Sequence, residues 1–242
     1  MRKSALKISL FAIAISCTAL SCKKDSTSAT ATSSEVAFDV SSDNPGTVVA
    51  AVNSPVVQSF GTAAIANNLV WTAGVANIST FKLEAKKNGV QAEIITKNLT
   101  VDLFALTPAT IAAKIDTGTY KEIEIKAVLQ QSAGNDIPLK LNGTFTTPGG
   151  VLVPIEFDYN DAAVIKVEAE NVTVDGTNNI SAHLGLHLNR LLSSISSAEL
   201  ANATRTGGAI VVSSTSNTAI YNKVRLNILL AFISKGWEKR RK

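Results

Sequence analysis

"YKEIEIKAVL", residues 120–129, is the stretch that decides the fold, because apolar and charged residues alternate in it with a period of two. The apolar positions that share one face of this segment are Ile123, Ile125, Ala127 and Leu129. Glu122, Glu124 and Lys126 fall on the opposite face. This alternation is typical of a β-strand that buries one face and exposes the other, so the segment is predicted to be such a strand.

The same alternation recurs from about residue 69 to residue 188. The segments that show it are 81–96, 137–145, 151–157, 164–174 and 180–188. Asn88-Gly89 within the first of them is a strong hairpin signal. Pro154 has no N–H to donate, which predicts an edge strand or a bulge there. Strands at this spacing predict an antiparallel β-sandwich, and since aromatic residues make up only 5% of the chain, its core consists mainly of Val, Ile, Leu and Ala.

The two ends of this region differ from its middle. Apolar residues with helical spacing predict one helix, or two short ones, over 190–202 and another over 217–234, with Ser216 or Asn217 as the N-cap. Residues 36–66 are harder to interpret, although 36–40 and 47–52 have the composition of strands on either side of a turn. We assign the whole of 36–234 to one sandwich domain with C-terminal helices.

The N-terminus has the features of a secretory signal peptide. A short basic start precedes thirteen uncharged residues, 8–20, which are too few for a membrane-spanning helix of roughly 20 residues. We therefore predict a signal peptide over 1–21. The Ser/Thr/Ala-rich segment that follows, 22–35, is predicted to be a flexible tether.

"ALSC", residues 19–22, resembles the lipobox of bacterial lipoproteins. The resemblance implies that Cys22 carries the lipid and becomes the first residue, and that Cys17 leaves with the signal peptide. We further predict a Gram-negative envelope protein held at the outer membrane through Cys22, either periplasmic or surface-exposed. The alternative is an ordinary signal peptide with an incidental cysteine. A single remaining thiol excludes an intrachain disulfide.

Net charge argues against a nucleic-acid partner. Three of the 23 Lys and Arg residues lie in the signal peptide and five in the segment 235–242, so 15 remain in 22–234 against 18 acidic residues. The body is therefore mildly acidic and lacks the basic stripe that phosphate binding requires. The basic tail, 235–242, is predicted to be a solvated, frayed terminus, with contact to anionic lipid as the alternative.

Few residues in the sequence suggest catalysis or metal binding. His183 and His187 would lie about 13 Å apart along a strand, which argues against a shared metal ion. Asp158, Asn160 and Asp161 gather at a strand end, where such residues cap turns more often than they bind calcium. No catalytic motif, cofactor or metal is predicted.

One part of the chain is similar to an uncharacterised family of domains of unknown function that is common in bacterial lipoproteins. The matching segments are "VDLFAL" (101–106), "IDTGTYKEIEI" (115–125), "LKLNGTF" (139–145) and "IEFD" (155–158). The resemblance spans about residues 69–161 and implies an Ig-like or transthyretin-like sandwich, without catalytic residues or a known ligand. Tyr120 in this region opens a strand from which its hydroxyl can reach the preceding turn, as in a tyrosine corner.

These features together predict a lipid-anchored, non-enzymatic envelope protein with a role in binding, adhesion or assembly and a protein or glycan ligand. The alternative is an envelope hydrolase that acts on carbohydrate through loop carboxylates such as Asp158 and Asp161. A third hypothesis is a pilus-type subunit that exchanges strands through an exposed edge.

Overall fold

The computed structural model describes residues 33–43, 46–47 and 68–241. These residues lie in one compact unit that is mainly β, as predicted. The signal peptide, Cys17, Cys22, most of the tether and residues 48–67 fall outside the described residues.

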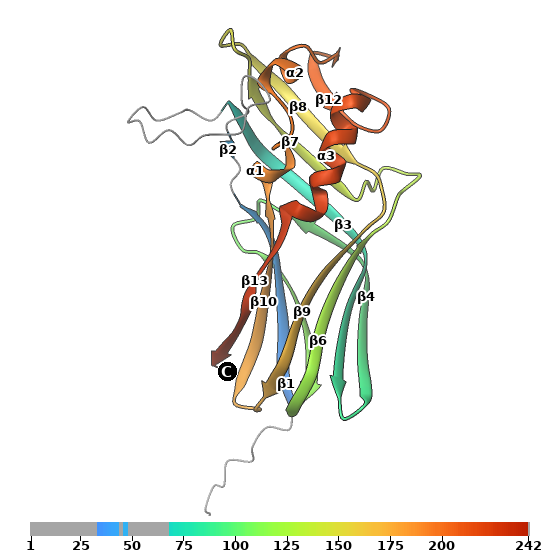
Figure 1. Cartoon of the computed structure of the whole chain (residues 1–242), viewed down its shortest axis with the longest axis vertical. Coiled ribbons are helices and arrows are strands. Elements are labelled where there is room, and N and C mark those ends of the chain that lie inside the picture. The colour runs from blue at the N-terminus through green and yellow to red at the C-terminus, as the bar shows by residue number, and fades with distance from the viewer. Residues whose placement is uncertain (1–32, 44–45, 48–67, 242) are drawn as a thin grey trace, which may run out of the picture. The chain divides into compact units, whose positions relative to one another are not determined.

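The described strands form two sheets (Figure 1). The first contains, in order, β13 (Phe232–Arg241), β10 (Asn178–His187), β1 (Ser33–Asp43) and β5 (Ala109–Asp116). The second contains β11 (Arg205–Thr206), β12 (Ala209–Val212), β8 (Leu152–Tyr159), β7 (Leu139–Thr146), β3 (Leu69–Lys87), β6 (Gly118–Leu129) and β9 (Ala163–Val174), with β2 (Gly46–Thr47) and β4 (Val90–Asp102) also paired to β3. The helices are α1 (Leu188–Leu191), α2 (Ser197–Ala201) and α3 (Thr218–Ala231).

The predicted alternation is confirmed by burial. In β6 the four apolar side chains from Ile123 to Leu129 are all at most 1% exposed. The Asn88-Gly89 turn joins β3 to β4, and both residues have positive φ, as a two-residue hairpin turn requires. Phe38 of β1 and Phe81 of β3 are in contact, with ring centroids 5.4 Å apart and ring planes tilted by 46°, as expected where two sheets pack face to face as a sandwich.

The prediction of a purely antiparallel sandwich is wrong at two places. β1 pairs in parallel with β10, and β12 pairs in parallel with β8. Each parallel pair joins strands far apart in the sequence, for which no hairpin dictates direction. β9 and β10 are consecutive, yet they belong to different sheets. The sandwich is therefore mixed, and an Ig-like or transthyretin-like type remains a prediction.

The boundaries at both ends of the domain also need correction. β1 begins at Ser33, inside the predicted tether, and the predicted basic tail is not frayed but belongs to β13, which pairs with β10. The predicted helix over 217–234 ends at Ala231, because Phe232 takes an extended conformation and starts β13. The segment 190–202 holds two short helices, one of the two predicted arrangements, but the first of them begins earlier, at Leu188. No helix among the described residues is long and apolar enough to cross a membrane.

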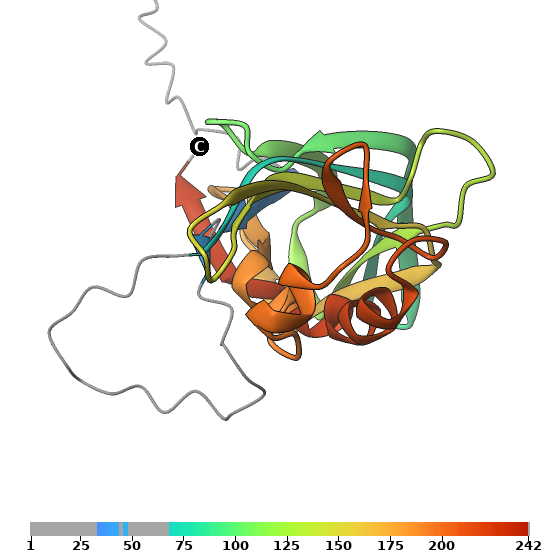
Figure 2. The same cartoon turned by 90° about the horizontal axis from the view of Figure 1, so that it is seen from above.

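Pro154 lies in β8, which is not an edge strand, because β7 and β12 flank it. The paired part of β12 begins opposite Ile155, so no ladder bond is required from the nitrogen of Pro154 on that side. The three helices cover β7, β8 and β12, as Figure 1 and Figure 2 show. Tyr221 of α3 packs against Phe157 of β8 with ring centroids 6.3 Å apart.

β3 is the strand that joins the two halves of the larger sheet. One edge of it pairs with β4 from Val75 to Lys87. The other edge pairs with β7 over Leu69–Ala76 and then with β6 over Thr80–Lys86. Between these two partners, at residues 77–79, the edge of β3 is bordered by neither strand, and the sheet forks.

Tyr120 behaves as its sequence context predicts. Its ring is 3% exposed, and its hydroxyl donates to the carbonyl oxygen of Asp116 at 2.7 Å. This bond ties the start of β6 to the turn before it.

We expect Tyr120→Phe to preserve the fold and to lower the free energy of unfolding by about 1 kcal/mol, because one buried hydrogen bond is lost. Chemical denaturation measures this change. Tyr159→Phe is the matched control: Tyr159 is equally buried, but its hydroxyl reaches the carbonyl of Ala162 only at 3.3 Å, so its loss costs less. An unchanged stability for Tyr120→Phe would contradict the role assigned to this bond.

Candidate functional site

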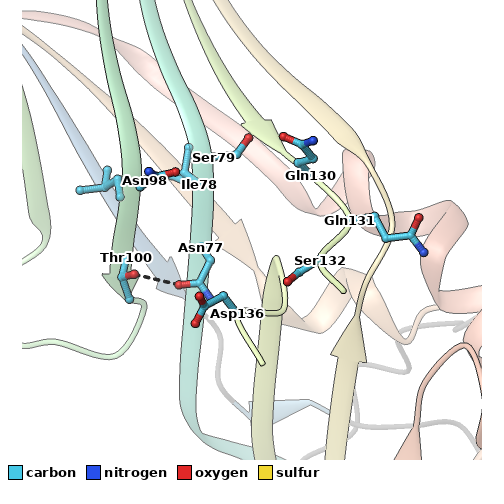
Figure 3. A pocket seen from close by; sticks show the side chains of 10 residues that line it. Asn77, Ile78, Ser79, Asn98, Thr100, Gln130, Gln131, Ser132 and Asp136 are labelled. Atoms are coloured by element: carbon cyan, nitrogen blue, oxygen red, sulfur yellow. Dashed lines mark hydrogen bonds between the residues drawn. The ribbon is translucent and has the colours of Figure 1, made fainter. Parts of the chain in front are cut away.

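A polar pocket of about 240 Å³ lies at the fork of β3 (Figure 3). Three elements line it: the unpaired stretch of β3, the facing part of β4 and the loop from β6 to β7. The lining residues are Asn77, Ile78, Ser79, Asn98, Leu99, Thr100, Gln130, Gln131, Ser132 and Asp136. Eight of these ten side chains carry an amide, hydroxyl or carboxylate group, so the pocket offers many hydrogen-bonding groups.

Some of these groups hold the fork together. The amide nitrogen of Asn77 donates to the carbonyl oxygen of Ile137 at 2.8 Å, and its oxygen accepts from the hydroxyl of Thr100 at 2.9 Å. The hydroxyl of Ser79 donates to the carbonyl oxygen of Val128 at 2.9 Å. The backbone nitrogen of Asn77 also donates to the carbonyl oxygen of Pro138 at 2.8 Å, so these side chains add to a backbone bond at the fork and help to fix the pocket walls.

Asn160 fixes the loop that closes the pocket. Its side-chain oxygen accepts from the backbone nitrogen of Ser132 at 2.8 Å, and its nitrogen donates to the carbonyl oxygen of Ser132 at 2.9 Å. From the sequence, Asn160 is expected to lie in an acidic turn. Its bonding to Ser132 could not be predicted, because the two residues are 28 positions apart. Its capping role agrees with the prediction for this turn, but the residue that it caps belongs to the pocket.

Four lining side chains do not take part in these structural hydrogen bonds. Asn98, Gln130, Gln131 and Asp136 are exposed, and none of their side chains hydrogen-bonds to another described residue. Asn98 has a φ of 55° within β4, at a position opposite Ser79 where the ladder between the strands is interrupted. These four groups are therefore available to a ligand.

The chemistry of the lining suits an uncharged polar ligand. An amide side chain both donates and accepts hydrogen bonds, as a sugar hydroxyl does. The lining contains no Lys or Arg, and Asp136 is its one carboxylate, so it offers nothing to balance an anion. The sequence did not predict this site, because its members come from three segments that only the fork brings together.

Asp158 and Asp161, the two carboxylates of the hydrolase hypothesis, do not face each other. Asp158 lies on the face of β8 opposite to Phe157 and Tyr159, where its carboxyl faces the ammonium of Lys140 at 3.7 Å. Burial raises the pKa of Asp158. Asp161 instead accepts a hydrogen bond from Tyr221 of α3 at 2.9 Å, on the side of the sheet that the helices cover.

Asp161 is held further by the guanidinium of Arg225, 3.3 Å away. Burial, together with the hydrogen bond to Asp161, raises the pKa of Tyr221 to about 12. Asp158 and Asp161 thus have separate partners on separate faces, and they do not form the facing pair that glycoside hydrolysis requires.

Asp175 is likewise used within its own turn. Its carboxylate accepts hydrogen bonds from the side chains and backbone of Thr177 and Asn178, which hold the pKa of Asp175 well below its ordinary value. The prediction that the acidic residues at turns cap backbone groups is confirmed here.

A row of charges crosses the outer face of the larger sheet. Glu93, Glu84, Glu124 and Glu168 lie directly opposite one another on β4, β3, β6 and β9. The adjacent row contains Lys82, Lys126 and Lys166, also in register. Like charges within each row repel one another, but every glutamate contacts a lysine of the other row.

Two of these glutamates are buried although they lie on the outer face. Glu84 is 7% and Glu124 is 4% exposed, covered by the lysine side chains that pair with them. The ammonium of Lys82 lowers the pKa of Glu84. Burial alone would raise the pKa of Glu124, but the ammonium groups of Lys126 and Lys166 outweigh burial and lower it.

Carboxylates of Glu122, Glu124 and Glu168 come within 4.8 Å of one another, as the ligands of a metal ion would. Each of them already contacts a lysine: Lys86 contacts Glu122 at 2.8 Å, and Lys166 contacts both Glu124 and Glu168. Lysine ammonium groups therefore supply the positive charge that this cluster requires.

Comparison with protein-family models, with curated proteins and with solved structures finds no match for this chain. The resemblance of residues 69–161 to a lipoprotein domain family therefore stays a prediction.

The lowered pKa values of the two buried glutamates, Glu84 and Glu124, predict that the stability of the fold depends on pH. Their folded pKa values lie below the ordinary 4.5, so their stabilising effect is complete above about pH 4.5 and is lost as the pH falls through the lowered values. We expect Glu124→Gln to lower the free energy of unfolding by about 1–2 kcal/mol at pH 7 and by less at pH 3, which lies below the ordinary 4.5, where the stabilising effect of the native carboxylate is declining. Urea unfolding at both pH values measures the difference.

Glu93→Gln is the control for this experiment. Its carboxyl belongs to the same row but its side chain is 39% exposed, so we expect a change below about 0.5 kcal/mol. An equal loss in both variants, or a loss for Glu124→Gln that does not shrink at low pH, would contradict the assigned role of the buried charge.

Proposed function

We propose that this chain is a lipid-anchored protein of the Gram-negative envelope, held at the outer membrane, that binds a neutral glycan in the pocket at the fork of β3. The role is binding or adhesion rather than catalysis. The observation that carries the proposal is the set of four exposed amide and carboxylate side chains around one pocket, without hydrogen-bond partners among the described residues.

Support for the anchor comes from the N-terminal sequence. Residues 1–21 have the pattern of a signal peptide, and Cys22 stands at the position that a lipobox lipidates. Each CH2 group of the acyl chains on Cys22 that is buried in the bilayer would contribute about 0.8 kcal/mol to membrane binding, and stable attachment requires more than one chain. The folded unit begins at Ser33, so the residues between Cys22 and β1 would link lipid to protein.

Support for a glycan comes from the match between amides and hydroxyls. Gln130, Gln131 and Asn98 can each donate to one sugar oxygen and accept from another. Leu99, which is half-buried, adds an apolar surface on which the C–H face of a sugar ring can pack. A charged ligand would require a cation in the lining, and the lining has none.

Binding is favoured over cleavage because the pocket has one carboxylate. Glycoside hydrolysis ordinarily requires two carboxyl groups that flank the scissile bond. Asp136 has no carboxylate partner among the lining residues, and the pair that the sequence suggested, Asp158 and Asp161, is separated by the sheet.

We expect Gln130→Ala to weaken the binding of neutral oligosaccharides about tenfold, because one or two hydrogen bonds to the ligand are lost. A panel of neutral hexose and N-acetylhexosamine oligosaccharides on an array, followed by calorimetry with the best of them, measures this effect. Gln91→Ala is the matched control, since Gln91 is an exposed glutamine of β4 that lies outside the pocket. Failure of every oligosaccharide to bind, or an equal effect of the two variants, would refute the glycan proposal.

The anchor has an independent test. We expect Cys22→Ala to move the protein from the membrane fraction to the soluble fraction of cells, because no residue remains to carry the lipid. Cys17→Ala is the control and should stay with membranes, since Cys17 leaves with the signal peptide. Membrane fractionation followed by mass spectrometry of the N-terminal peptide measures both. A Cys22→Ala protein that still fractionates with membranes would disprove the anchor.

A further inference from the structure

The two histidines of the chain lie on one face of β10, with Gly185 between them. His183, Gly185 and His187 alternate with the buried residues Leu184 and Leu186. Their strand is as predicted, but the inference drawn from it, that the side chains are too distant to share an ion, considered only the spacing along the backbone.

The imidazole rings lean toward each other across the glycine. A Cβ atom built on Gly185 would lie 3.4 Å from Nε2 of His183 and 3.8 Å from Nε2 of His187. The two nitrogens are therefore separated by no more than the sum of these distances, far less than the spacing of their backbones. The hollow between them exists because residue 185 has no side chain.

A neighbouring carboxylate orients one of the rings. Asp43 of β1 pairs in register with His187, and its Oδ1 lies 2.8 Å from Nδ1 of that ring. A proton on Nδ1 that is shared with a carboxylate leaves the lone pair on Nε2, the atom that faces the hollow. This carboxylate–histidine arrangement is the one that supports metal-binding histidines in general.

His183 presents the same atom to the hollow. The hydroxyl of Ser41, the residue of β1 opposite Gly185, lies 3.3 Å from Nε2 of His183. This hydroxyl can keep its contact with the imidazole ring, or an ion can displace it from Nε2. His183 is partly exposed and lines a surface pocket, so an ion can reach it from solvent, whereas Nε2 of His187 is itself buried.

We propose that His183 and His187 bind one divalent transition-metal ion between their Nε2 atoms above Gly185, with water in the remaining positions. Imidazole nitrogen suits Zn²⁺, Ni²⁺ and Cu²⁺. Zinc–nitrogen bonds of about 2.0–2.1 Å require the two nitrogens to be roughly 3.3 Å apart, which side-chain rotation over an unoccupied Cβ position allows. The site is separate from the glycan pocket and does not depend on it.

Calorimetry with zinc or nickel chloride tests the proposal on the full chain in detergent, purified without a polyhistidine tag. We expect one ion per chain, and a loss of affinity of at least about tenfold in His183→Ala and in His187→Ala. Asp43→Asn should weaken binding about 10–100-fold, as losing an orienting carboxylate does.

Gly185→Ala is the most specific test of the proposed geometry. The added methyl group meets the rings at ordinary contact distance, so the fold tolerates it, but it fills the space between the nitrogens. We expect it to abolish binding while circular dichroism and the unfolding midpoint stay unchanged. Retention of wild-type affinity in this variant would overturn the proposed geometry.

Glu168→Gln is the control for the position of the ion, because Glu168 belongs to the acidic cluster on the other sheet. It should leave zinc binding unchanged. Loss of binding in Glu168→Gln with no effect of the histidine variants would place the ion at the acidic cluster and refute the proposal.

Electron paramagnetic resonance of the wild-type protein with one equivalent of Cu²⁺ needs no variant. Nitrogen hyperfine coupling from two imidazoles is the expected result. A bound copper signal without nitrogen coupling, or the absence of a bound copper signal, would overturn the site even if every variant failed to fold.

Discussion

The satisfaction of backbone hydrogen bonds along β3 is the constraint on which the rest of this structure depends. A strand of 19 residues exposes donors and acceptors on both edges, and burying them unpaired would be costly. β4 covers most of one edge, whereas β7 and β6 divide the other between them. Because two strands cannot occupy one position, they diverge at residues 77–79, where a backbone bond from Asn77 and the side chains of Asn77 and Ser79 complete the bonding. The pocket is the space left by that divergence, so fold and candidate site have a single cause.

The two faces of the larger sheet show how far alternation alone can specify a structure. The apolar face could be predicted residue by residue, and Asn88-Gly89 identified a hairpin that the structure contains. On the other face, alternation marked Glu124 as polar and therefore as exposed. Its burial follows from register, which sets a row of glutamates beside a row of lysines, and register depends on which strands pair. The sequence lists both sets of charges, but it does not show that they meet.

What could not be predicted shares one property, which is long sequence separation. β1 pairs with β10 across more than a hundred residues, and the basic C-terminus becomes a strand only because β10 offers it an edge. Arg240 of that strand reaches Asp39 of β1 at 3.1 Å. The amide clamp of Asn160 on Ser132 and the approach of two imidazoles over Gly185 are contacts of the same kind, set by neighbours rather than by local pattern. Local propensity predicts the elements, and tertiary pairing determines the sites.

The proposed glycan pocket and the proposed lipid anchor are linked by energetics. The walls of the pocket are fixed by Asn77, Ser79 and Asn160, so they cost no further ordering when a ligand arrives. The ligand-facing glutamines are exposed and free to rotate, and each loses on the order of 1–2 kcal/mol of side-chain entropy when it is immobilised. A few hydrogen bonds of about 1 kcal/mol each then leave only a modest affinity for a single site. Anchoring many copies on one membrane would compensate, because a ligand with repeating units engages a second copy at high effective concentration. A weak, rigid pocket is thus suited to a protein fastened to a surface, and it would be poorly suited to the same protein free in solution.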